Sequence, residues 1–194
     1  MPDATLLIVR HPETEANVSG RFVGQGESPF TAVGRVQARR LARKIVAFRP
    51  DAVWSSPLER ALSVARLAAK RADVPLVVER RLIELDFGEA HGLTWEEIAE
   101  AGIPFDYRAA EQPVAPGGES RNQLLARVGA AVDQVAALSG RSALVCHAGV
   151  MRAILAHSLG LSGDQLWAFS IHNAQLATVR FVDGHAQLEE FVKG

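Results

Sequence analysis

The stretch Leu6-Leu7-Ile8-Val9-Arg10-His11 joins a short apolar run to two basic residues, and it decides how the rest of the 194-residue chain is interpreted. A run of this length that contains β-branched residues suits a strand buried on both faces of a sheet. The first run covers residues 5–9, and similar runs follow at residues 52–54, 76–78 and 142–146. The repeated pattern favours a largely parallel sheet.

Helical patterns lie between these runs, at residues 32–48, 57–71 and 120–138, and a further helix is expected after Cys146. In the first pattern, basic residues surround an apolar face that is expected to be buried. That face consists of Val33, Val36, Leu41, Ile45 and Phe48. The second pattern opens with Pro57, a residue favoured at the first position of a helix. The third has the clearest repeat, formed by Leu124, Leu125, Val128, Val132, Val135 and Leu138.

The C-terminal segments 174–182 and 186–192 are separated by Asp183-Gly184 and predict a hairpin.

Strands that alternate with helices predict the α/β class, here a three-layer α/β/α sandwich around a mostly parallel central sheet. With 48% hydrophobic residues, the chain has room for one well-packed core, so residues 1–194 are interpreted as a single domain. The proline-containing stretch 102–118 is expected to be an ordered loop or flap.

The balance of charge argues against nucleic acid or an anionic membrane as a partner. The chain carries 21 Lys and Arg against 22 Asp and Glu, a formal net charge of −1, so an anionic ligand has to be captured locally.

The first residues contain no basic leader, and no apolar run approaches the length that spans a bilayer. The single cysteine, Cys146, excludes an intramolecular disulfide and fits a reducing compartment. We therefore expect a cytoplasmic protein.

Polar residues directly follow three of the predicted strands. Arg10-His11 ends the first, Ser55-Ser56-Pro57 leads from the second to Arg60, and His147 follows the last. In open α/β sheets the ligand site lies beyond the carboxyl ends of the strands, so these residues are expected to meet there. In the Arg10-His11 pair, the arginine can bind an anion and the imidazole can act as a nucleophile. Each of these three sequence elements taken alone could equally contain ordinary surface or packing residues.

A carboxyl group in apolar surroundings completes the candidate site. Glu84 lies within Leu82-Ile83-Glu84-Leu85-Asp86-Phe87, and a carboxyl near apolar groups can keep a proton to give to a leaving oxygen. Asp86 competes for that role, and either carboxyl could instead be a structural cap.

Taken together, these pieces resemble the histidine phosphatase superfamily, which includes the cofactor-dependent phosphoglycerate mutases. The resemblance runs nearly from end to end and begins with Arg10-His11-Pro12-Glu13-Thr14 in the first block. The blocks lie at residues 7–17, 31–38, 55–61, 84–92, 116–120 and 147–152. The resemblance implies a phosphoglycerate mutase-like fold. It also implies a metal-independent hydrolase of the histidine acid phosphatase type, without a cofactor.

The resemblance also implies a role for each residue of the site. His11 accepts the phosphoryl group as a phosphohistidine, and Glu84 is the acid that protonates the leaving oxygen and then activates water. The phosphate oxygens are expected to be bound by Arg10, Asn17, Arg60 and His147. Planar arginine donors supply the charge that a metal would otherwise supply.

Two details of the first block leave alternatives open. Pro12 stands where the family usually has glycine, which puts a backbone contact in doubt because proline has no N–H. We expect the site to survive, since its side-chain donors are present. Arg21 and Phe22 follow Asn17 closely and are expected at the rim of a substrate pocket, with an ordinary loop as the alternative.

Other residues that could carry chemistry are given structural roles. The remaining histidines lack the mutual spacing of zinc ligands, so no metal site is expected. They are His91, His157, His172 and His185. Cys146 is interpreted as a buried strand residue, and Trp54, Trp95 and Trp167 as core or packing residues.

Three classes of function compete: a phosphatase, a phosphoglycerate mutase-type phosphoryl transferase, and a non-catalytic phosphate-binding regulatory domain. The short stretch between Gly92 and Ser120 leaves little room for the extra segments of the mutases and favours the phosphatase. The blocks at residues 85–88 and 116–120 are similar to the α-ribazole phosphatase type and to broad-specificity relatives. A small phosphorylated substrate is expected, with α-ribazole phosphate, a phosphosugar and a phosphoglycerate as candidates. The assembly is left open between a monomer and a homodimer.

Overall fold

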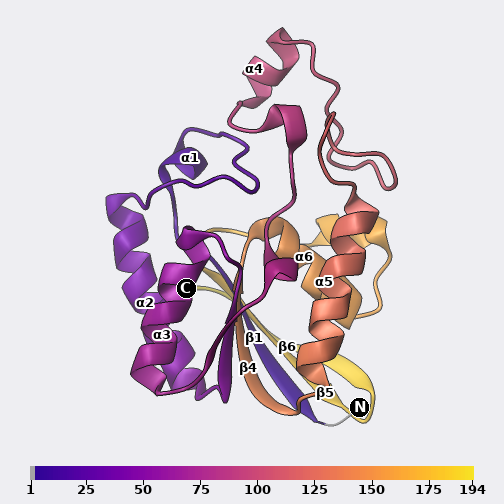
Figure 1. Ribbon diagram of the computed structural model, residues 1–194. Coiled ribbons are helices and arrows are strands. Elements are labelled where there is room, and N and C mark those ends of the chain that lie inside the picture. The colour runs from indigo at the N-terminus through magenta and orange to yellow at the C-terminus, as the bar shows by residue number, and fades with distance from the viewer. Residues whose placement is uncertain (1–2) are drawn as a thin grey trace.

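The computed structural model describes residues 3–194 and is built around a six-stranded sheet in the order β3-β2-β4-β1-β5-β6 (Figure 1). Four strands pair in parallel, namely β1 (Ala4–Arg10), β2 (Ala52–Ser55), β3 (Leu76–Val78) and β4 (Gly140–Cys146). A C-terminal hairpin of β5 (Gln175–Val182) and β6 (His185–Lys193) continues the sheet, with β5 antiparallel to β1. The mostly parallel sheet and the hairpin are therefore confirmed.

The helices cover both faces of this sheet. They are α1 (Glu15–Val18), α2 (Ala32–Phe48), α3 (Glu59–Ala72), α4 (Trp95–Glu100), α5 (Arg121–Ala136) and α6 (Ala148–Ser158). Short 3-10 turns occur at Arg80–Leu82, Gly88–Ala90 and Gly163–Ala168. In β1, Leu6 and Ile8 pack with α5 and α6, whereas Leu7 and Val9 pack with α2 and α3 (Figure 1). This alternation confirms the predicted three-layer α/β/α sandwich.

The buried face of α2 differs from the predicted one. Val33 and Val36 are 55% and 45% exposed, while the buried positions include Gly34, Leu41 and Ile45. Positions 34, 41 and 45 form one stripe because they are separated by seven and four residues, close to whole turns of a helix. Val33 and Val36 lie off this stripe, so the prediction was wrong for both.

Two helix boundaries also differ from the prediction. Pro57 precedes α3, because the Ser56 hydroxyl oxygen accepts a hydrogen bond from the Leu58 N–H and Leu58 stays extended as the N-cap. Arg60 still falls in the first turn, as predicted. Leu138 is 59% exposed because α5 ends at Ala136 and the chain turns through Ser139 at a φ of 58°.

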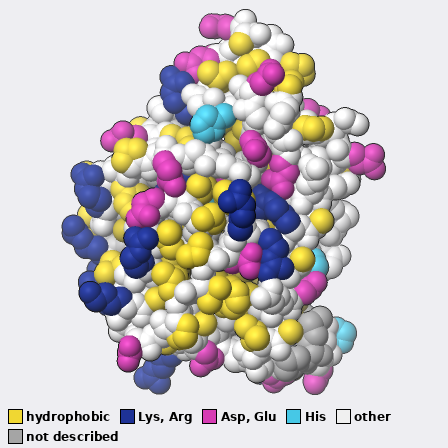
Figure 2. All heavy atoms as spheres, viewed as in Figure 1, with side chains coloured by type: hydrophobic (Ala, Val, Ile, Leu, Met, Phe, Trp, Pro, Cys, Tyr) yellow, Lys and Arg dark blue, Asp and Glu magenta, His cyan; other side chains and the backbone are white. Residues whose placement is uncertain are grey.

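The segment that carries α4 and residues 102–118 rises above the carboxyl ends of the strands (Figure 1). Apart from an isolated bridge between Pro113 and Ser120, residues 102–118 contain no helix or strand, which agrees with an ordered loop. On the face shown in Figure 2, Lys and Arg side chains are scattered among acidic and apolar ones. Within residues 3–194, no helix has the length and hydropathy needed to cross a membrane.

Candidate functional site

The register of β1, β4 and β2 brings the two predicted site histidines together. Arg10 pairs with Cys146, so the next residues, His11 and His147, leave the sheet side by side with their ring centroids 5.2 Å apart. β2 lies on the other side of β4, which places the Ser56 hydroxyl 2.6 Å from His147 Nε2. The site therefore begins at the carboxyl ends of the strands, as predicted.

His11 is held as a neutral imidazole with one nitrogen left open. Its Nδ1 lies 2.6 Å from the Pro12 carbonyl oxygen, and because a carbonyl can only accept, Nδ1 carries the proton. Burial holds the pKa of His11 well below its usual value, and the charges of Arg10 and Arg60 lower it further. The lone pair is therefore on Nε2, the nitrogen that can attack an electrophile at the pocket wall.

Pro12 is compatible with this arrangement. The contact to His11 uses the carbonyl oxygen of Pro12, which proline and glycine both have, and Asn173 Nδ2 donates to the same oxygen at 3.3 Å. The missing N–H leaves the hydrogen bond that orients His11 intact.

His147 is completely buried behind His11. The Ser56 hydroxyl can donate its proton to His147 Nε2, and in that tautomer the ring proton is on Nδ1. That Nδ1 is buried and has no hydrogen-bond partner among the described residues. Burial holds the pKa of His147 well below its usual value, with a further contribution from Arg60. A buried unpaired donor beside the nucleophile suits an anionic ligand.

Arg10 and Arg60 are fixed by backbone carbonyls on either side of the pocket. Arg10 Nη1 donates to Ile171 O at 2.9 Å, and its buried Nε has no partner within residues 3–194. Arg60 Nη1 and Nη2 donate to the carbonyls of Gly26 and Gly24, at 2.5 and 2.6 Å. Burial lowers the pKa of Arg10 to about 10, so the guanidinium stays charged at neutral pH. Both arginines therefore present oriented positive charge.

Asn17 is oriented by three donors. Its Oδ1 accepts from the backbone N–H of Thr14 at 3.1 Å, from Thr14 Oγ1 at 3.0 Å and from Asn173 Nδ2 at 2.8 Å. Because the backbone N–H of Thr14 can only donate, the Asn17 atom that it contacts is the amide oxygen. The two hydrogens on Asn17 Nδ2 are then available to a ligand. Asn17 lines the same pocket as His11.

The two competing carboxyls are separated by the structure. Glu84 lines the pocket, where Oε1 accepts from Leu85 N–H at 2.9 Å and Oε2 from Gly149 N–H at 3.2 Å. A Cβ at Gly149 would lie 2.6 Å from Glu84 Oε1, so this approach requires glycine. Asp86 instead caps the backbone N–H of Gly88 at 2.9 Å and is absent from the pocket lining. Glu84 is thus the carboxyl that shares the pocket with His11.

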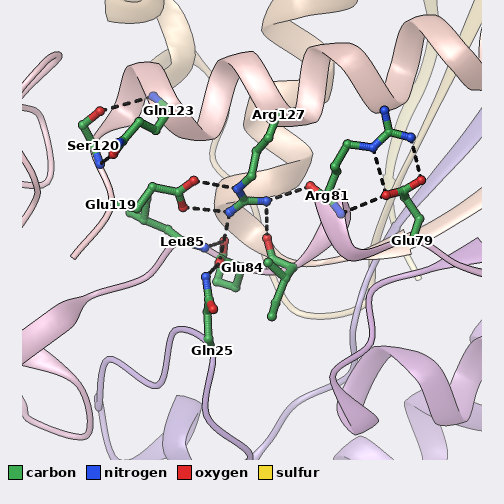
Figure 3. Close-up of polar contacts among 10 residues, drawn as sticks. Gln25, Glu79, Arg81, Glu84, Leu85, Glu119, Ser120, Gln123 and Arg127 are labelled. Atoms are coloured by element: carbon green, nitrogen blue, oxygen red, sulfur yellow. Dashed lines mark hydrogen bonds and ion pairs between the residues drawn. The ribbon is translucent and has the colours of Figure 1, made fainter. Parts of the chain in front are cut away.

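Arg127 of α5 fixes the backbone around Glu84 (Figure 3). Its Nη1 donates to the carbonyls of Arg81 and Ile83, both at 2.7 Å, and its Nη2 donates to the Glu84 carbonyl at 3.1 Å. The carboxylate of Glu119 pairs with the same guanidinium at 2.6 and 2.8 Å. These bonds hold residues 83–87, which belong to no helix or strand, and no sequence pattern predicts them.

The pocket has a volume of about 420 Å³ and an aromatic outer wall. Arg21 and Phe22 both line it, as expected for rim residues, and Arg21 pairs with Glu97 of α4 at 2.6 Å. The other aromatic lining residues are Phe87, Trp95, Tyr107 and Trp167. Trp95 and Trp167 pack edge to face against Tyr107, as expected of packing residues, and they also line the pocket, which was not predicted. Trp54 is a core residue.

The sequence prediction assigned no role to Arg152, which lines the pocket from the second turn of α6. Its neighbours along the helix, Val150, Met151 and Ala153, are buried in the core. A lone arginine in an apolar helix, at the right spacing to share a face with Ala148 and Gly149, is the sequence signal that could have identified it.

Other candidate groups lie outside this arrangement. In the part of the chain that the structure describes, no group of three or more His, Cys, Asp or Glu side chains could hold a metal ion. His157 pairs with Asp133 at 2.7 Å, away from the pocket. Burial raises the pKa of the Cys146 thiol, which disfavours the thiolate that a nucleophile requires.

Acidification is expected to destabilise the protein through the two buried histidines. The pKa of each is about 6.5 in the unfolded chain and lower in the folded one, so below that value the unfolded chain binds more protons. The free energy of unfolding should then fall by up to about 1.4 kcal/mol per pH unit for each histidine. Urea unfolding between about pH 7 and about pH 5 measures this slope.

The control compares two histidine variants. The free energy of unfolding of His147→Asn should fall less steeply on acidification than that of the parent. His185 is exposed, so His185→Asn should show the same slope as the parent. Identical slopes in all three proteins would contradict the neutral state assigned to His147.

Comparisons with known proteins place the chain in a family. The family model described as "Histidine phosphatase superfamily (branch 1)" matches residues 6–193. The chain is 39% identical over 157 residues to a metal-independent phosphoserine phosphatase of Arabidopsis thaliana, covering 77% of this chain and 66% of that protein. It is 32% identical over 192 residues to an adenosylcobalamin/alpha-ribazole phosphatase of Salmonella typhimurium, covering 95% and 94%. A solved structure of a mycobacterial glucosyl-3-phosphoglycerate phosphatase in complex with VO3 gives a TM-score of 0.85 at 26% identity, covering 98% and 99%.

Proposed function

Because this chain belongs to the histidine phosphatase superfamily, we propose that it hydrolyses small phosphomonoesters through a phosphohistidine formed on His11. The observation that carries the proposal is the state of His11. Its Nδ1 proton is held by the Pro12 carbonyl, its ring is neutral, and it lines the pocket between the fixed charges of Arg10 and Arg60. A neutral, oriented imidazole beside two guanidinium groups suits attack on a phosphate dianion.

In the first step, the lone pair of His11 Nε2 attacks phosphorus and the bond between phosphorus and the ester oxygen breaks. Glu84 gives its proton to the departing oxygen, so the alcohol leaves neutral and Glu84 becomes a carboxylate. Arg10, Arg60, the Asn17 amide and His147 Nδ1 are proposed to bind the non-bridging oxygens, where charge is spread in the transition state.

In the second step, the Glu84 carboxylate removes a proton from water, and the oxygen of that water attacks phosphorus. The bond between His11 Nε2 and phosphorus breaks, inorganic phosphate leaves, and Glu84 regains the proton it needs for the next cycle. The Leu85 and Gly149 backbone N–H groups hold Glu84 in place during both steps.

The relatives named above act on phosphoserine, α-ribazole phosphate and glucosyl-3-phosphoglycerate, by their names. We therefore propose a small phosphorylated metabolite as the substrate of this chain. An activity screen over these phosphomonoesters, with 3-phosphoglycerate isomerisation measured in parallel, tests the hydrolase against the mutase.

Hydrolysis is expected to survive chelation of divalent metals. The guanidinium groups of Arg10 and Arg60 supply the positive charge that Mg²⁺ or Zn²⁺ supplies in other phosphoryl-transfer sites. Turnover of p-nitrophenyl phosphate before and after dialysis against EDTA should differ by less than about twofold if this charge suffices. Complete loss of turnover that a divalent ion restores would contradict metal independence.

The remaining sequence predictions concern the protein in its cell. We propose a cytoplasmic location and a single domain over residues 1–194, and leave the choice between monomer and homodimer to a light-scattering mass in solution.

A further inference from the structure

Arg152 is a half-buried arginine with unused hydrogen-bond donors. Its Nε donates to the Phe169 carbonyl at 3.0 Å, and its guanidinium carbon lies 5.1 Å from the centroid of the Trp167 ring. These two contacts fix the group at the pocket. Among the side chains and backbone groups that the structure describes, none accepts a hydrogen bond from Nη1 or Nη2. The N–H bonds of both nitrogens are therefore available to a ligand.

Arg152 lines the same pocket as Glu84, the proposed proton donor. The charged groups that lower the pKa of His11 are Arg10 and Arg60, and Arg152 is not among them. Burial lowers the pKa of Arg152, and the interaction with Glu84 opposes this effect. Arg152 in turn lowers the pKa of Arg10, so its charge is felt both at the phosphate-binding arginine and at the proposed proton donor. The ester oxygen must depart beside Glu84, so the alcohol part of a substrate would lie within reach of Arg152.

An aromatic wall continues from Arg152 around this part of the pocket. Trp167 meets Tyr107 edge to face at 4.6 Å, Tyr107 meets Trp95 at 5.7 Å, and Trp95 meets Phe22 at 5.2 Å. All four rings line the pocket, and Trp95 is 49% exposed without a ligand. Such a wall can pack against the carbon skeleton of an alcohol while Arg152 binds a charged group on it.

The charges of the pocket leave room for another anion. Arg10, Arg60 and Arg152 provide three positive charges, whereas His11 and His147 are neutral and Glu84 is protonated in the first step proposed above. A phosphomonoester dianion balances two of these charges. A negative charge on the alcohol can balance the third.

We propose that Arg152 and the aromatic wall of Phe22, Trp95, Tyr107 and Trp167 form a subsite that selects phosphomonoesters whose alcohol part carries a second anionic group. The inference rests on the proposed phosphatase function and specifies its substrate class. Both a carboxylate and a second phosphate have the acceptor geometry that a guanidinium binds with two hydrogen bonds.

The test uses three aryl phosphates that differ only in the group at the para position: 4-carbamoylphenyl phosphate, 4-carboxyphenyl phosphate and 1,4-phenylene bisphosphate. The neutral carboxamide is a close match to the carboxylate in shape. The parent protein should prefer at least one of the anionic substrates in kcat/KM. Arg152→Gln should lower kcat/KM for that substrate by about 10- to 100-fold, mainly through KM, because a charged hydrogen bond is lost. Its kcat/KM for the carboxamide should change by less than about threefold.

Two further variants complete the design. Arg152→Lys should restore part of the preference because it keeps the charge, and Arg43→Gln, an exposed arginine of α2, should behave as the parent. The more strongly affected of the two anionic substrates identifies the group that Arg152 binds. Equal losses on all three substrates would assign Arg152 to phosphoryl transfer itself, and unchanged kinetics would remove it from the pocket chemistry. Either result overturns the subsite while the phosphatase function stands, whereas failure of the parent to hydrolyse any of the three would count against that function.

Discussion

The His11→Ala variant is expected to lose turnover of every phosphomonoester, by at least about 10⁴-fold in kcat. The reason is that no other group in the pocket can accept the phosphoryl group. The neighbouring imidazole, His147, uses Nε2 to contact the Ser56 hydroxyl and has its remaining proton on a buried Nδ1. The measurement is steady-state hydrolysis of p-nitrophenyl phosphate and of an alkyl phosphate, with His185→Ala as the matched control at an exposed position.

The loss has to be separated from a loss of folding. His11 is buried, so the thermal unfolding of His11→Ala and of the closer replacement His11→Asn should be compared with the parent. If either variant is folded and retains activity within about tenfold of the parent, His11 is not the nucleophile.

Glu84→Gln is expected to separate substrates by their leaving groups. Glutamine keeps the size of the side chain and one oxygen that can accept from the Leu85 or Gly149 N–H, but it cannot donate the proton that an alkoxide needs. Hydrolysis of alkyl phosphates should fall by roughly 10²- to 10⁴-fold. The first step with p-nitrophenyl phosphate should be much less affected, because nitrophenolate leaves without protonation, and phosphoenzyme should accumulate as activation of water becomes limiting.

Asp86→Asn is the matched control for this contrast. Asp86 lies two residues from Glu84 but caps the Gly88 N–H outside the pocket, so its variant should keep the parent's ratio between alkyl and aryl substrates. Equal losses for both leaving groups in Glu84→Gln, or a leaving-group contrast in Asp86→Asn, would contradict the assignment of the acid.

The layers of the fold were accessible from the sequence because they depend on local patterns. Apolar runs of strand length, separated by helical repeats, predicted the parallel strands and the C-terminal hairpin. The match of the family model over residues 6–193 confirms the resemblance to the histidine phosphatase superfamily. The meeting of His11 and His147 also followed from the pattern, since each is the first residue after one of two strands that pair in parallel.

Other features depended on contacts that no local pattern encodes. Val33 and Val36 have the apolar character of core residues but lie off the stripe of α2 that faces the sheet. Arg127 bonds to carbonyls more than 40 residues away in the sequence, and its type and spacing on α5 give no sign of them.

The aromatic wall of the pocket could not be predicted from the sequence either. Tyr107 and Trp167 meet edge to face at 4.6 Å although they come from irregular or 3-10 segments that are distant in the sequence. The hydrogen bond that orients His11 uses the carbonyl oxygen of Pro12, an atom that every residue type carries, so it does not depend on which residue stands there.

The most direct test of the central claim is to locate the phosphoryl group on the quenched enzyme. Glu84→Gln is mixed with p-nitrophenyl phosphate, quenched in base because phosphohistidine is labile in acid, digested, and analysed by mass spectrometry. We expect one phosphoryl group on the peptide that contains His11, carried by Nε2, and no such group when His11→Ala is combined with the same variant. A phosphoryl group on His147, on Ser56 or on any other residue, or labelling that persists without His11, would contradict it.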